Sequence, residues 1–64
     1  MTLEQIKAAV DNGYTVHWMN PGYKVIKTQR GEYQIVFTPN DHCIGLTHRD
    51  GVTLNGKPTE FYIG

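Results

Sequence analysis

Large apolar and polar side chains alternate along most of the stretch from Tyr14 to Leu54. A period of two is typical of β-strands with one buried face, because successive side chains point to opposite sides of a strand. Short sequences rich in Gly, Pro, Asn and Asp interrupt the alternation and predict turns. The pattern therefore predicts strands at 14–19, 23–28, 32–38 and 43–48 and a short fifth strand at 52–54, all joined by local turns.

The turn sequences also predict how the strands pair. Gln29-Arg30-Gly31 has the form of a three-residue hairpin loop closed by a glycine in the left-handed region, which sets Val25 opposite Ile35. The same reasoning at all four turns predicts the pairs Val16–Val25, Trp18–Tyr23, Tyr23–Phe37, Thr28–Glu32, Phe37–Ile44, Ile35–Leu46, His48–Val52 and Leu46–Leu54. This register gives one face the bulky side chains, namely Val16, Trp18, Tyr23, Val25, Tyr33, Ile35, Phe37, Ile44, Leu46, Val52 and Leu54.

Residues 2–11 predict one short helix. Thr2 is suited to cap it, with Gln5 where a capping box requires Glu or Gln, and Asn12-Gly13 is typical of a helix end. A helix this short is not stable alone in water, so we expect its apolar stripe to lie on the apolar face of the sheet. The expected fold is α+β, a short N-terminal helix packed on one face of a twisted antiparallel β-meander of about five strands, with residues 1–64 as a single domain.

The last residues predict a short extended segment. Pro58 argues against a long strand after the turn signal Asn55-Gly56, whereas Phe61 and Ile63 share one face. We expect this segment either to close the core or to pair with an open edge of the sheet.

Composition and charge narrow the classes of function. Six basic and six acidic residues give a net charge of zero, which argues against nucleic-acid binding as the main activity. A local basic patch is still compatible with a net charge of zero. One cysteine excludes an internal disulfide and favours a reducing, cytoplasmic location. No signal-peptide pattern is visible, and no stretch approaches the ~20 apolar residues of a membrane span, so we expect no membrane partner.

The only cluster of chemically reactive side chains is Asp41, His42, Cys43 and His48. It lacks the spacing of a metal site, and Cys43 and His48 fall on opposite faces of the predicted strand. Cys43 is better interpreted as a small filler, His42 as a loop residue and His48 as a hairpin residue bonded to the backbone. We therefore expect no catalytic residue, no metal, no cofactor and no enzyme activity.

Two features suggest binding surfaces. Aromatic residues interleaved with lysines and arginines resemble a platform for single-stranded nucleic acid, but most of them fall on the face that the helix covers. The opposite face carries an apolar group, His17, Met19, Ile26 and Val36, which either reflects β-propensity alone or forms a contact surface for another protein or a second copy. The predicted function is a small non-enzymatic protein-interaction module acting through this face or an open sheet edge; the alternative is weak nucleic-acid binding.

Three groups of turn and strand residues carry a resemblance to known sequences. They are Gly13-Tyr14-Thr15-Val16-His17-Trp18, Gly22-Tyr23-Lys24-Val25-Ile26, and Ile44-Gly45-Leu46-Thr47 with Asp50-Gly51 and Leu54-Asn55-Gly56. The chain resembles short proteins of unknown function encoded in proteobacterial genomes, phages and plasmids. The resemblance implies a bacterial or mobile-element context and assigns no functional residue.

Overall fold

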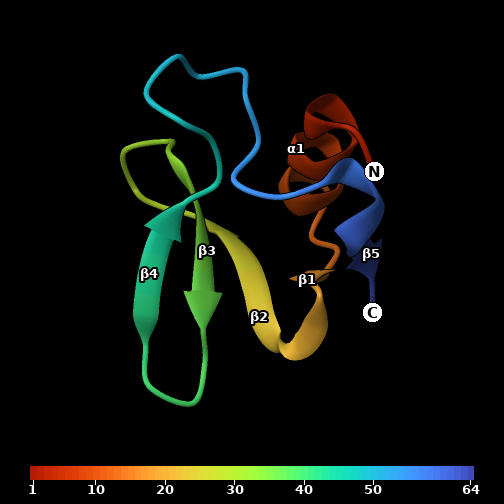
Figure 1. Ribbon diagram of the computed structural model, residues 1–64, viewed down its shortest axis with the longest axis vertical. Helices are drawn as coiled ribbons and strands as arrows, with labels where there is room; N and C mark the ends of the chain where they lie inside the picture. The colour runs from red at the N-terminus through yellow and green to blue at the C-terminus, as the bar shows by residue number, and fades with distance from the viewer.

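A computed structural model describes all 64 residues. One α-helix packs on an open antiparallel sheet (Figure 1). The elements in chain order are α1 (Leu3–Asp11), β1 (Val16–Trp18), β2 (Asn20–Lys27), β3 (Tyr33–Phe37), β4 (His42–Gly45), the 3-10 helix η1 (Pro58–Glu60) and β5 (Phe61–Ile63). The five strands lie in the order β4-β3-β2-β1-β5, so β4 and β5 are the two edges. The predicted α+β class is confirmed.

Helix α1 begins and ends with the predicted capping residues. The Thr2 hydroxyl accepts a hydrogen bond from the Gln5 amide at 3.2 Å, and the Gln5 side chain accepts one from the Thr2 amide at 2.9 Å. At the other end Gly13 has φ +85°, and the amides of Gly13 and Tyr14 donate to the carbonyls of Val10 and Ala9. These bonds satisfy main-chain groups that the helix leaves free, so the chain can turn directly into β1.

The predicted register of the two central strands is confirmed. Val25 lies opposite Ile35 and Tyr23 opposite Phe37, and Gly31 closes the hairpin with φ +83°. The core lies between this face and α1 and consists of Ile6, Ala9, Val16, Val25, Ile35, Leu46 and Phe61. Ile26 and Val36 are half-buried on the opposite face. The apolar stripe of α1 therefore packs on the face that the alternation predicted.

The predicted pair Trp18–Tyr23 is wrong, because the chain reverses earlier than expected. Trp18 lies opposite Asn20, and the ladder is irregular between Val16 and Trp18. Met19 occupies the left-handed region with φ +67° and makes the reversal, so Asn20-Pro21-Gly22 is the start of β2 and not a turn. The indole of Trp18 still contacts the ring of Tyr23, with centroids 4.9 Å apart.

The predicted pairing of the third and fourth strands is wrong by two residues. Ile35 lies opposite Ile44, not Leu46, and Phe37 lies opposite His42, not Ile44. The Asn40 side chain accepts the amide of His42, and Asp41 takes φ +56°, which ends the turn earlier. A shift of two keeps every side chain on its predicted face, so the hydrophobic pattern does not distinguish the two registers.

The predicted fifth strand at 52–54 does not form. A single bridge joins Thr47 to Leu54, one residue away from the predicted pairing of Leu46 with Leu54. The Asp50 carboxylate accepts the amides of Val52 and Thr53 at 2.9 Å each, which draws an extra residue into the loop. Val52 is consequently 70% exposed, so the prediction that it lies on the core face is wrong.

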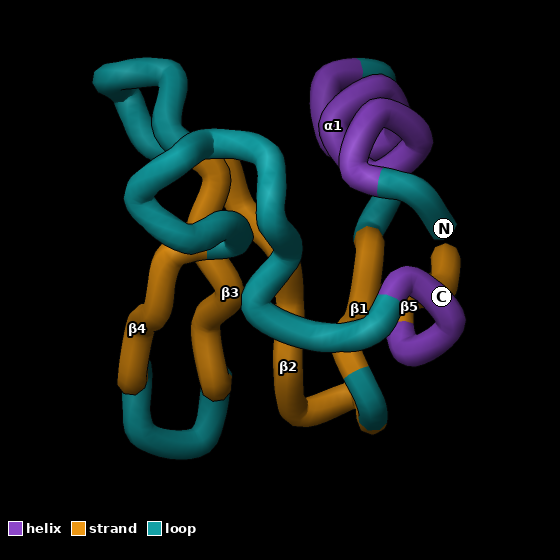
Figure 2. Tube along the Cα trace, turned by 45° about the horizontal axis from the view of Figure 1, so that its top comes forward, coloured by secondary structure: helices purple, strands orange, loops and turns teal.

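The fifth strand is instead the C-terminal segment, which pairs with β1. Val16 lies opposite Ile63 and Trp18 opposite Phe61. Reaching β1 from β4 requires a long connection across the covered face, which Figure 2 shows passing in front of β2 and β1. The sheet is therefore not a pure meander. The final segment meets both expectations for it, since it pairs with a sheet edge and its Phe61 is buried.

Candidate functional site

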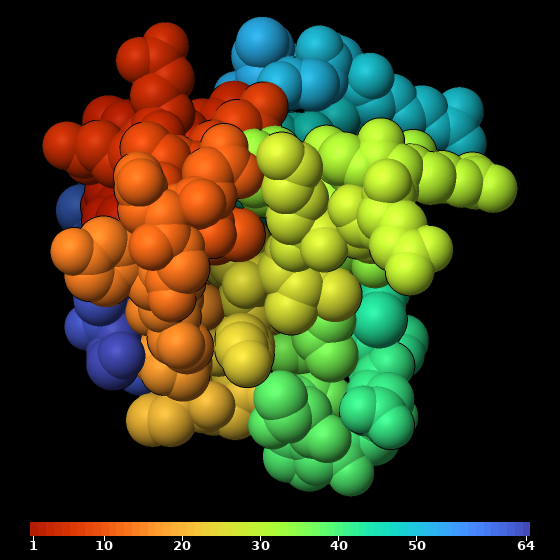
Figure 3. All heavy atoms as spheres, turned by 180° about the vertical axis from the view of Figure 1, so that it is seen from behind, coloured from red at the N-terminus to blue at the C-terminus, as the bar shows by residue number.

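Of the predicted contact residues His17, Met19, Ile26 and Val36, only Met19 is largely exposed, and the other three are half-buried. Ile26 pairs with Gln34, and Val36 pairs with Lys24, so the two apolar side chains are diagonal neighbours on the face that α1 leaves uncovered. Both are half-buried, whereas Met19 is 55% exposed at the reversal between β1 and β2. From behind, atoms of β2 and β3 lie at the centre of the view, atoms of α1 and β1 lie along one side, and the later connection lies at the rim (Figure 3).

His17 lies in the irregular part of the ladder between β1 and β2, where its ring contacts the main chain of β2. Its Nδ1 lies 2.8 Å from the carbonyl oxygen of Tyr23, and because a carbonyl only accepts hydrogen bonds, Nδ1 carries the proton. The ring also packs against Tyr62, with centroids 5.4 Å apart. His17 thus adds a side-chain hydrogen bond to the main chain at the reversal.

The cluster predicted from Asp41, His42, Cys43 and His48 is dispersed. Cys43 is exposed on β4 with its Sγ 3.5 Å from the Asp41 carbonyl oxygen, whereas His48 lies beyond the strand in the following loop. No three side chains among His, Cys, Asp and Glu come together in an arrangement that could hold a metal ion. Neither helical segment has the length and apolarity that crossing a bilayer requires.

The two edges of the sheet differ in how their main-chain groups are used. Gly64 donates its amide to the Thr15 carbonyl, and Met19 donates to the Glu60 carbonyl. In an antiparallel ladder, every second residue of an edge strand bonds to its neighbour, and here these are Glu60 and Gly64. The N–H and C=O groups of Phe61 and Ile63 therefore point away from β1, toward solvent. The amide of Phe61 is already bonded to the Pro58 carbonyl. The free groups on this edge are therefore the Phe61 carbonyl and both main-chain groups of Ile63.

The opposite edge, β4, is partly closed. Its outward groups belong to Cys43 and Gly45, and the Asn55 side chain donates to the Gly45 carbonyl at 2.8 Å. All four residues of β4 are exposed, and Ile44 is its only large apolar residue. Covering an edge with a side chain is one of the ways in which proteins prevent unwanted strand pairing, and β5 has no such cover.

An apolar groove of about 590 Å³ runs beside β5, between that strand and α1. One wall comes from the helix and its flanks, through Met1, Gln5, Ala8, Ala9 and Asn12. The other comes from Tyr14 and from Phe61, Tyr62 and Ile63 of β5. Seven of the nine lining residues are hydrophobic, and no side chain among them carries a charge. The groove is shallow and largely open to solvent, so it suits side chains of a bound chain segment better than an enclosed small molecule.

Three of the six large hydrophobic residues that the chain exposes lie at this groove. Tyr14 is 59% exposed, Ile63 51% and Tyr62 38%. The sequence carried one signal of this site, because Phe61-Tyr62-Ile63 is an unbroken apolar run of which one strand face can bury only part. The sequence predicts an open sheet edge as a binding surface but identifies neither this strand nor the groove beside it.

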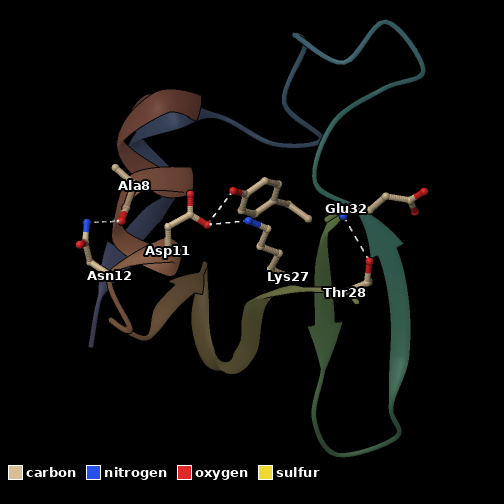
Figure 4. A network of polar contacts seen from close by, with 7 residues as sticks. Ala8, Asp11, Asn12, Lys27, Thr28 and Glu32 are labelled. Atoms are coloured by element: carbon tan, nitrogen blue, oxygen red, sulfur yellow. Dashed lines mark hydrogen bonds and ion pairs between the residues drawn. The ribbon is translucent and has the colours of Figure 1, made fainter. Parts of the chain in front are cut away.

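A polar network joins the C-terminal end of α1 to β2 and β3 (Figure 4). The Tyr33 hydroxyl donates to the Asp11 carboxylate at 2.7 Å, and Lys27 Nζ donates to the same oxygen at 3.3 Å. The bond from Tyr33, with Lys27 beside it, lowers the pKa of Asp11 below its ordinary value, and Asp11 raises the pKa of both partners. This network offsets the unfavourable position of a carboxylate at a helix C-terminus.

Two basic side chains lie at one aromatic ring, with the Nζ atoms of Lys7 and Lys27 at 5.3 and 5.4 Å from the Tyr33 centroid. Lys24 and Lys27 lie on opposite faces of β2, and Lys27 is engaged with Asp11. A polar hollow of about 560 Å³ lies between the β2–β3 turn and the loop after β4, and its lining mixes Lys7 and Arg49 with Glu32. The aromatic rings of Trp18, Tyr23 and Phe37 are half-buried and pack on one another. This distribution gives no continuous basic track beside a row of stacked rings.

Comparison with known proteins gave no match among protein-family models, curated proteins or solved structures.

Proposed function

We propose that this protein is a small protein-interaction module that binds an extended polypeptide segment by strand addition at β5. The observation that carries the proposal is the uncovered main chain of Phe61 and Ile63 next to an apolar groove. Strand addition uses such an edge for main-chain hydrogen bonds and uses neighbouring pockets for alternate side chains of the bound segment.

The groove supplies the side-chain part of this recognition. A segment paired with β5 would place every second side chain on the covered face, where the wall of α1 and Tyr14 continues the apolar surface. Uncharged lining residues favour an apolar segment over a charged one. The uncovered face with Ile26 and Val36 stays the second location predicted for binding, and the same experiment separates the two.

The test is selection from a displayed library of random peptides on the immobilised wild-type protein. Selected peptides are then titrated into isotope-labelled wild type, Ile63→Asp, Val36→Glu and Val52→Asp, and followed by NMR. Ile63→Asp places a charge at the groove, whereas Val52→Asp is the matched control in an exposed loop. We expect Ile63→Asp to weaken binding by about tenfold or more and the other two variants to bind as wild type does.

Three outcomes would contradict the proposal. The library could yield no peptide that binds, or the selected peptides could bind Ile63→Asp as tightly as wild type. Binding that is lost in Val36→Glu but kept in Ile63→Asp would assign recognition to the uncovered face of the sheet instead.

A further inference from the structure

Building on the proposed function, we infer that the extended segment accepted by β5 is β5 of a second copy, which joins two sheets into one across a two-fold axis. A two-fold interface uses the same surface on both partners, so that surface must be complementary to itself. The free groups, side chains and charges along β5 meet this requirement in turn.

The free main-chain groups are complementary across such an axis. When two antiparallel β5 strands are centred on Tyr62, Ile63 lies opposite Phe61 of the second copy. The free Ile63 amide then faces the free Phe61 carbonyl of the copy, and the symmetry repeats the bond in the other direction. The Phe61 amide, already bonded to the Pro58 carbonyl, is not needed for this pairing.

The side chains are complementary in the same register. Ile63, half-exposed in the single chain, would lie next to Phe61 of the second copy at the mouth of its groove. The central row of the sheet, which includes Ile35, Val25 and Val16 and ends at Ile63, would continue into the apolar residues of the second copy. On the other face the two Tyr62 rings would be directly opposite, at a spacing that suits aromatic pairs.

The distribution of charge along β5 permits two copies to approach one another. The lining of the groove contains no charged side chain, and the N-terminal ammonium group is bonded to the Pro58 carbonyl at 2.6 Å. The whole chain has a net charge of zero, so long-range repulsion does not keep two copies apart. An identical neutral surface can therefore approach without placing like charges opposite one another.

The experiment is sedimentation equilibrium over protein concentrations from about 10 μM to about 1 mM, since a short paired strand predicts a dissociation constant on the order of 100 μM. Ile63→Pro removes the outward amide without removing a bond to β1. Cys43→Pro is the matched control, because it removes an outward amide from the other edge strand. Ile63→Lys keeps the backbone and adds a charge to the seam, and circular dichroism checks that each variant is folded.

We expect wild type and Cys43→Pro to form dimers alike, and both Ile63 variants to weaken dimerisation by about tenfold or more. A wild type that stays monomeric throughout, or a dimer that survives in Ile63→Lys, would overturn the inference. If wild type is monomeric but selected peptides still bind at Ile63, the inference fails and the proposed function stands. If neither dimer nor peptide binding is found, both fail.

Discussion

Replacing Ile35 with Val tests where the core lies by a change that should leave the chain folded. Ile35 is 1% exposed, and shortening a fully buried Ile to Val costs about 0.5–1.5 kcal/mol of unfolding free energy. A chain of this length is expected to have a total stability of roughly 3–10 kcal/mol, so the variant stays folded while the loss is measurable. With a urea dependence of about 1 kcal/mol per molar, the unfolding midpoint should fall by about 1 M.

The matched control is Ile26→Val, the same chemical change on the uncovered face. Ile26 is half-buried, so the loss of one methylene, worth about 0.8 kcal/mol when fully buried, should cost less than about 0.4 kcal/mol. Unfolding is followed by the fluorescence of Trp18, the only tryptophan, which is partly buried next to Phe61. Equal losses for the two variants, or a larger loss for Ile26→Val, would refute the assignment of the two faces.

Two further predictions concern the connection across the sheet. Gly56→Ala should lower stability by about 1–3 kcal/mol, because a Cβ at this position would overlap the Trp18 indole; an unchanged midpoint by circular dichroism would show that the connection does not pack there. Hydrogen bonds from Thr53 and from the Val52 amide lower the pKa of Asp50 to about 2, so its stabilising effect is present above its ordinary value of 3.8 and is lost as pH falls toward 2. The fall in urea midpoint between about pH 5 and about pH 2.5 should therefore be smaller in Asp50→Asn than in wild type, and an equal fall in both would contradict this origin.

The parts of the fold that could be predicted depend on signals close together in the sequence. The β2–β3 register follows from a three-residue loop with Gly31 in the left-handed region and from alternation on both sides of it. The helix follows from Thr2, Gln5 and Gly13, all of which act within a few residues. In these segments local turn chemistry and the hydrophobic pattern agree, which is why the prediction was correct there.

The parts that could not be predicted depend on side-chain bonds or on distant contacts. The pattern cannot detect a two-residue slip of β4, because Ile44 stays on the same face in either register. Val52 lies outside the core because the Asp50 carboxylate accepts hydrogen bonds from two amides of the loop, and the hydrophobic pattern carries no sign of these bonds. The groove brings Ala8, Tyr14 and Ile63 together from three parts of the chain, so only the tertiary structure reveals it.

Hydrogen exchange at the Ile63 amide tests the central claim, that the open edge of β5 is the interaction surface. The amide should exchange freely in dilute protein and become protected by about tenfold or more when the concentration is raised or a selected peptide is added. The outward amide of Cys43 on the other edge provides the comparison and should not change. Protection at Cys43 in place of Ile63, or no protection at Ile63 under either condition, would contradict the account.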